Sequence, residues 1–350
     1  MILPGSYAFS VVLLILSLLC WGLWANTFKL AGKWRYELYY FDFAIGMSIA
    51  ALIAALTFGS MGWDGFSFLD DVRNAGKRQE LFAFLGGGVF NLGNVLLLAS
   101  ISVSGLSVGL PIGLGVALIT GAMWSWVSHP AGSPVFIAGG CIAVAAGVVL
   151  NALGYKAYAL TARRQPSASQ SKGKPAKKDN GTKAVLLGVA AGLLLGSFAP
   201  LLDLARDTDN GLGPYSIAFI VSAGVVASTF VYSLFLMNLP VQGQPVDFGE
   251  YFKGNGRQHG LGVLGGLLFS IGTIASLVAG KAEGPAHPGA FLSYATQHGA
   301  LVVGAICGIF AFKEFADGDS KVKTLLFLSL FLVATGITMV GLAPRLGLGV

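Results

Sequence analysis

Ten long apolar stretches constrain this chain more than any other feature of its sequence. Each holds about 20 residues, the length that a helix needs to cross the hydrocarbon core of a bilayer. The predicted spans cover residues 7–30, 37–60, 80–101, 105–127, 134–155, 184–205, 215–237, 259–280, 288–311 and 323–343. The sequence therefore predicts an all-α polytopic membrane protein with ten transmembrane helices.

The composition agrees with a membrane fold and argues against several other classes. Charged residues make up 11% of the chain, whereas a soluble domain carries about 25%, so most of the surface cannot face water. The basic residues fall between the apolar spans, and the net charge of +6 therefore needs no nucleic-acid partner. Cysteines and histidines show no metal-ligand spacing, so we expect neither a metal nor a cofactor. The first span lacks a cleavage pattern and is interpreted as a retained helix.

One stretch of the chain is duplicated. Leu85–Gly105 aligns without a gap with Leu264–Gly284, which lies 179 residues later, and the matched positions include Phe90 with Phe269 and several glycines. An odd number of spans per copy makes the second copy insert upside down, as in transporters built from inverted repeats. The predicted domains are a first five-helix repeat (1–156), a basic flexible linker (157–183) and a second five-helix repeat (184–350).

Lysine and arginine predict the orientation of the spans. Of the 22 basic residues, 16 lie on the side of the linker and six on the other side. Because cytoplasmic loops carry an excess of basic residues, we expect a multi-pass protein of the cell (inner) membrane with the linker inside and both termini outside. The linker sequence at Thr161–Thr182 is rich in Ser, Lys, Pro and Gly, which is typical of a poorly ordered segment.

Polar residues inside the duplicated spans are candidate ligands for a substrate. Asn94 is mid-span among apolar neighbours, Asn91 shares its face, and Thr273 belongs to the second copy. A buried amide in hydrocarbon needs a hydrogen-bond partner, either another helix or a ligand. Small residues let helices pack closely, so we expect the third and eighth spans to approach at Gly93 and Gly272, with Asn94 and Thr273 at the midplane.

The first and ninth spans are expected to complete the wall of the substrate site. Trp24 lies deep in the first span and, with Asn26, could line a cavity or simply pack. Tyr294, Gln297 and His298 share a helix face in the ninth span. A tyrosine, an amide and an imidazole can stack on a flat polar solute and hydrogen-bond it, although an interhelical network is the alternative.

Two residues are candidates for proton coupling. Asp42 lies just inside the second span, where an ionisable group indicates function by default; its structural alternative is an ion pair with Lys29, Lys33 or Arg35. His298 could also carry a proton. Glu314, at the end of the ninth span, is interpreted as a cap or an ion-pair partner. His259 stands at a span end, where we expect solvent.

The order and spacing of several short motifs resemble the ureide permease family of the drug/metabolite transporter superfamily. The motifs are Gly22-x-Trp24, Tyr40-x-Asp42-Phe43, Leu92–Gly93–Asn94, Gly105–Leu106–Ser107–Val108, Gly272 and Phe312-x-Glu314. The resemblance implies ten helices in two inverted halves and import of allantoin and related oxo-purine or pyrimidine compounds with protons.

Two features depart from the family pattern. The linker has no nucleotide-site-like motif, so no nucleotide role carries over. Thr273 stands where the family has Asn, and the polar set of the ninth span is arranged differently, which leaves the substrate open.

The leading interpretation is a secondary permease for a small polar solute such as allantoin, another ureide or a nucleobase, by proton symport. A sugar permease of the same superfamily is the alternative, since Asn, Gln and Trp also suit sugars. A non-transporting membrane scaffold or receptor would not need duplicated halves or polar midplane residues. A membrane enzyme would need an acid, base or metal constellation, and the sequence shows none. The coupling ion, the direction of transport and the oligomeric state stay open.

Overall fold

The computed structural model describes residues 1–128, 130, 132–164, 181–206 and 210–346. In this part of the chain every regular element is helical, and ten helices or helix pairs are long and apolar enough to cross a membrane. The prediction of a ten-helix all-α membrane protein is confirmed. The first five spans are α1 (Tyr7–Leu30), α2 (Tyr36–Leu56), α4 (Lys77–Ser104), α5 (Leu106–Ser128) and α6 (Pro134–Arg164). The second five are α7 (Gly181–Gly196) with α8 (Phe198–Arg206), α9 (Pro214–Asn238), α10 (Gly256–Gly280), α11 (Ala290–Ile306) and α12 (Ser320–Leu346).

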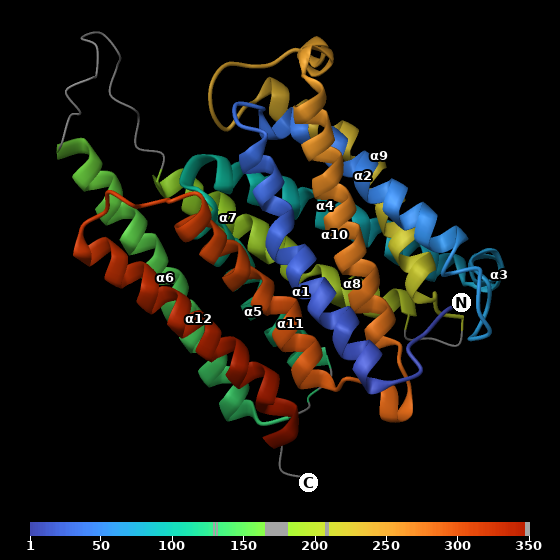
Figure 1. Ribbon diagram of the computed structural model, residues 1–350. Helices are drawn as coiled ribbons and strands as arrows, with labels where there is room; N and C mark the ends of the chain where they lie inside the picture. Colours follow the sequence, from blue (N-terminus) through green and yellow to red (C-terminus); the bar gives the residue numbers. More distant parts are fainter. Residues whose placement is uncertain (129, 131, 165–180, 207–209, 347–350) are drawn as a thin grey trace.

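Short elements join the spans at both ends of the bundle. A short helix, α3 (Phe68–Asn74), follows α2, and two 3₁₀ turns, η1 (Phe248–Lys253) and η2 (Gly284–Ala286), flank α10. Figure 1 shows the spans side by side, with η1, the α1–α2 turn and the end of α6 at one end of the bundle. We call this the linker-side end, and the end that holds Met1 and α3 the opposite end.

Helix pairing follows the same pattern in the two halves. Helix α4 packs against α9 and α7, whereas α10, the counterpart of α4, packs against α2 and α1. Glycines make these contacts close: Gly87 faces the backbone of Val221, and Gly266 faces the backbone of Phe43. The most extensive contact joins α6 to α12, the last span of each half, at one edge of the bundle. This pairing is what a duplicated fold requires; the inverted orientation of the halves stays a prediction.

A proline inside α5 is satisfied by a neighbouring helix. Pro111 has no N–H, so the carbonyl of Ser107, four residues earlier, loses its helical donor. The amide of Asn151 on α6 donates to that carbonyl at 3.0 Å, and Asn151 is fully buried. The proline is therefore tolerated because a side chain of α6 satisfies the backbone carbonyl that it frees in α5.

The sixth and ninth spans depart from a regular α-helix, and the fifth span is longer than predicted. The sixth span breaks between α7 and α8, four residues before Pro200, which lacks the N–H for the Gly196 carbonyl. The ninth span ends in a π-helical turn, η3 (Cys307–Ala311). Helix α6 continues to Arg164, into the segment assigned to the linker, because its end is rich in Ala, Leu and Arg, which favour helix. Residues 165–180 of the expected flexible linker lie outside the described residues.

Candidate functional site

An aromatic cluster joins four helices at the centre of the bundle. The ring of Phe269 on α10 lies 6.2 Å from Trp21 and 5.8 Å from Trp24, both on α1. It also lies 5.8 Å from Phe43 on α2 and 4.8 Å from Phe90 on α4. We call these five residues the Phe269 cluster. Centroid separations of 4.5–7 Å are those of interacting rings, so the cluster holds α1, α2, α4 and α10 together.

The central contact of the Phe269 cluster lies in the middle of its two helices. Phe90 is in the middle of α4 and Phe269 is in the middle of α10. The two phenylalanines are the matched positions of the duplicated stretch, and their rings meet at 4.8 Å. Transporters built from repeats bind their substrates near the midplane, where the repeats meet. This contact therefore marks the centre of the candidate site.

Polar side chains meet at the edge of the cluster. Asn94 donates from its amide to the hydroxyl of Tyr40 at 3.1 Å, and both residues are almost fully buried. Trp21 donates from its indole N–H to the hydroxyl of Thr273 at 3.2 Å. Asn94 and Thr273, both predicted from the sequence, thus lie at the edge of the cluster, and Trp24 belongs to the cluster itself. Rings with a few fixed polar groups are the usual lining of small-molecule sites.

Asn91 and Asn26 have different surroundings. The Asn91 amide nitrogen lies 3.1 Å from the carbonyl of Val225 and 2.6 Å from the hydroxyl of Ser228, both on α9. Its nitrogen therefore joins α4 to α9, which is the interhelical alternative that the sequence left open. The carbonyl oxygen of Asn26 is buried and has no hydrogen-bond partner among the described residues.

The polar residues of the ninth span divide between two environments. The rings of Tyr294 and His298 pack at 4.3 Å, and Tyr294 also contacts an apolar cluster that includes Leu118 and Val144. Trp24 belongs to a different apolar cluster. Gln297 is exposed. The structure thus places Trp24 in the Phe269 cluster and Asn94 and Thr273 at its edge, whereas Tyr294 packs against α5 and α6.

The expected approach of the third and eighth spans at their glycines is wrong. Gly93 faces Leu194 and Leu195 of α7, and Gly272 faces Cys20 and Trp21 of α1. Each glycine therefore allows close packing against the first span of the other half, α7 for Gly93 and α1 for Gly272. Helices α4 and α10 meet instead through the large rings of the Phe269 cluster, which hold their backbones apart.

A second cluster surrounds the buried carboxylate of Asp42. The hydroxyl of Tyr251 in η1 donates to Asp42 Oδ1 at 2.6 Å, and Nδ1 of His259 lies 3.0 Å from both carboxylate oxygens. The ring of Trp34 lies 5.4 Å from the imidazole. We call Asp42, Tyr251 and His259 the Asp42 cluster. The sequence placed His259 in solvent; in the structure its side chain is only 28% exposed, because the ring of Tyr251 packs against it at 4.7 Å.

The protonation of Tyr251 fits its role as a donor. Burial, together with the hydrogen bond to the Asp42 carboxylate, raises the pKa of the Tyr251 hydroxyl well above its usual range. Tyr251 therefore keeps its proton near neutral pH. Sequence reasoning missed Tyr251 and His259 because each is more than 200 residues from Asp42, and no local spacing connects them.

Glu314 ties three helices together at the linker-side end. Its carboxylate accepts the backbone N–H groups of Leu106 and Ser107 at 3.0 and 2.8 Å, which caps the start of α5. It also pairs with Lys29 of α1 at 2.7 Å. Burial alone would raise the pKa of Glu314, but Lys29 and the Ser107 donors outweigh it and hold the pKa below its usual range. The expectation that Glu314 is a cap or an ion-pair partner agrees with this geometry.

Comparisons with known proteins relate the whole chain to a permease. No protein-family model matches the chain. It is 23% identical over 388 residues to ureide permease 1 of Arabidopsis thaliana, across 96% of this chain and 97% of that protein. A crystal structure described only as that of a protein superposes with a TM-score of 0.56 at 15% identity, over 97% of this chain and 99% of that one. The second likeness concerns the fold alone.

Proposed function

We propose that this protein is a secondary permease that carries a small, flat, polar solute through the Phe269 cluster, with a ureide or a nucleobase as the cargo. The observation that carries the proposal is the mid-helix contact of Phe90 with Phe269, flanked by Asn94 and Thr273. Aromatic faces stack on a planar heterocycle, and amide and hydroxyl groups match its alternating donors and acceptors. The full-length likeness to a ureide permease supports the same class.

One cavity lies at each end of the bundle. A cavity of about 1000 Å³ at the opposite end is lined by the segment that leads into α1 and by the loops after α2, α8 and α10. A cavity of about 420 Å³ at the linker-side end is lined by the other end of α1. Along α1, Trp21 and Trp24 lie between the two. In this proposal the rings separate cargo on one side from cargo on the other, and the repeats rock about them.

In the same proposal the Asp42 cluster couples cargo movement to protons. Asp42 and His259 can each take up and release a proton, and Asp42 is one residue from Phe43 of the Phe269 cluster. Ionisable groups inside transporter helices commonly mark proton relays. The linker-side end, which carries most of the basic residues, faces the cytoplasm in this scheme.

Counterflow with purified protein tests the choice of cargo. Proteoliposomes loaded with one unlabelled solute should take up its labelled form from outside. Allantoin, uracil, xanthine and glucose are compared at equal concentrations. Uptake of allantoin or a nucleobase agrees with the proposal, whereas uptake of glucose alone selects the sugar alternative. Absence of counterflow for all four solutes in folded protein would contradict transport of this class.

Asp42→Asn tests the coupling. The amide keeps the size of the side chain but holds no exchangeable carboxyl proton, so we expect accumulation driven by a proton gradient to disappear while counterflow persists. Asp203→Asn is the matched control, because Asp203 pairs with Arg206 at 2.7 Å and lies outside the Asp42 cluster. Gradient-driven accumulation that survives Asp42→Asn would show that the proton moves elsewhere.

A further inference from the structure

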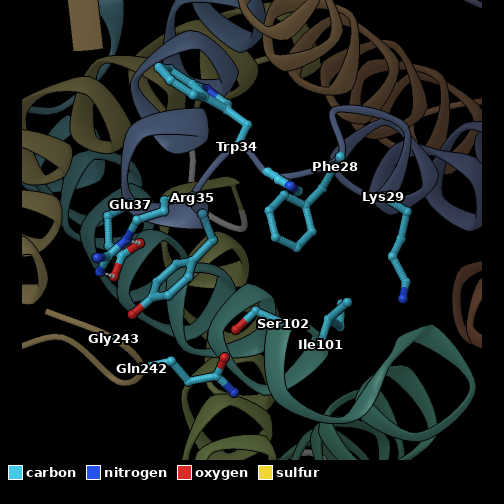
Figure 2. Close-up of a pocket in the computed structure, with 12 residues that line it drawn as sticks. Phe28, Lys29, Trp34, Arg35, Glu37, Ile101, Ser102, Gln242 and Gly243 are labelled. Carbon is cyan, nitrogen blue, oxygen red and sulfur yellow. Dashed lines mark hydrogen bonds and ion pairs between the residues drawn. The ribbon is translucent and has the colours of Figure 1, made fainter. Parts of the chain in front are cut away.

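The linker-side cavity has the size of a small-molecule site. It lies between the α1–α2 turn, the end of α4 and the loop after α9, and its volume is about 420 Å³. Ligand sites usually measure about 300–1,000 Å³. Its lining includes Lys29, Lys33, Arg35, Glu37, Ser102 and Gln242. Figure 2 shows Lys29, Arg35, Glu37, Ser102 and Gln242 around the cavity.

Two of the three cations are neutralised by carboxylates. Arg35 binds Glu37 through two nitrogens, at 2.6 and 3.2 Å, and also donates to the carbonyl of Gln244 at 2.6 Å. Lys29 pairs with Glu314. These contacts hold the side chains of Arg35 and Lys29 in place and use their N–H groups, which are then not available to a ligand. Arg35 and Glu37 therefore act as the wall of the cavity.

Lys33 is the cation that remains. It is exposed and has no ion-pair partner among the described residues. Gly32, with a φ of 70°, reverses the chain just after α1 and so places Lys33 at the mouth. Nearby, Lys183 of α7 donates to the carbonyl of Val241 at 2.5 Å, next to Gln242, and no carboxylate among the described residues pairs with it. The cavity and its rim carry more positive than negative charge.

We propose that this cavity binds a small oxyanion, a carboxylate or a phosphate, at Lys33, with the amide of Gln242 as a further donor. A lysine holds an oxyanion as a point charge with three donors. The oxyanion could be free in the aqueous phase, an ionised cargo or a lipid headgroup, and all three share this chemistry. The inference stands independently of transport through the Phe269 cluster.

Thermal unfolding of the purified full-length protein tests the proposal. The probes are inorganic phosphate, allantoate as an organic carboxylate, and dihexanoyl phosphatidic acid for the headgroup, each titrated at constant ionic strength against chloride. Binding to the folded state raises the midpoint with probe concentration. Lys33→Gln should weaken the affinity about tenfold, as the loss of one charge-assisted contact implies. Lys321→Gln removes the same charge from the start of α12, outside the cavity, and should leave the affinity unchanged.

The outcomes separate the sources of the oxyanion. A Lys33-dependent shift with phosphate, with allantoate or with phosphatidic acid alone supports a site for a free anion, for cargo or for a headgroup, respectively. Equal shifts in Lys33→Gln and Lys321→Gln overturn the proposal, because they show nonspecific charge effects. The absence of a shift with all three probes also overturns it. Counterflow is unaffected by either result, so failure here leaves the transport proposal intact.

Discussion

Replacing Asn94 with leucine separates a packing role from a binding role. In the structure Asn94 donates to Tyr40 at 3.1 Å, and the two residues are at most 1% exposed. Asn94→Leu keeps the volume but leaves the Tyr40 hydroxyl buried without this partner, which costs about 1–3 kcal/mol. Adding Tyr40→Phe removes that hydroxyl too. Because replacing both partners by apolar groups is nearly neutral, the double variant should regain most of the stability of the parent.

Cargo affinity should not recover in the double variant as stability does. If the Asn94 amide also contacts the cargo, both Asn94→Leu and the double variant lose that hydrogen bond, and affinity falls about 5- to 150-fold in each. Unfolding midpoints report the stability, and the concentration dependence of counterflow reports the affinity. Tyr40→Phe alone shows how much the tyrosine hydroxyl contributes.

Cargo affinity that changes in parallel with protein stability across these variants would contradict a binding role for Asn94. A double variant that regains both stability and affinity would show that Asn94 acts only by packing against Tyr40. Unchanged affinity in a well-folded Asn94→Leu protein would place the cargo site away from the Phe269 cluster. Loss of stability that Tyr40→Phe does not relieve would contradict the stated cost of the unpaired hydroxyl.

Two further variants test the packing and the electrostatics of the bundle. Because Lys29 and the helix cap lower the pKa of Glu314, its contribution to stability is complete above about pH 5 and is lost as pH falls through the lowered pKa. Glu314→Gln should therefore reduce the acid dependence of the unfolding midpoint, and an unchanged pH profile would contradict this. Gly266→Ala places a methyl group against the Phe43 backbone and should destabilise by about 1–3 kcal/mol. Gly260→Ala on the same helix meets open space, so equal unfolding midpoints for the two would refute the close packing.

The local sequence was sufficient for the spans because a membrane helix is defined by length and hydropathy alone. With no water to satisfy the backbone, an apolar stretch of about 20 residues has few alternatives to a helix. Duplication was equally visible, since Phe90 and Phe269 keep their spacing. The sequence also identified Asn94, Thr273 and Asp42 as costly polar residues that need partners, but it could not say which partners they have.

Those partners depend on how the helices pack. Gly93 and Gly272 both predicted close contacts, yet a glycine fits any neighbouring helix, and the structure pairs them with α7 and α1. His259 looked solvated because it stands at a helix end; only the fold of η1 over α10 brings it and Tyr251 to Asp42. Periodicity shows which residues share a helix face, whereas contacts across more than 200 residues arise only when all the helices are assembled.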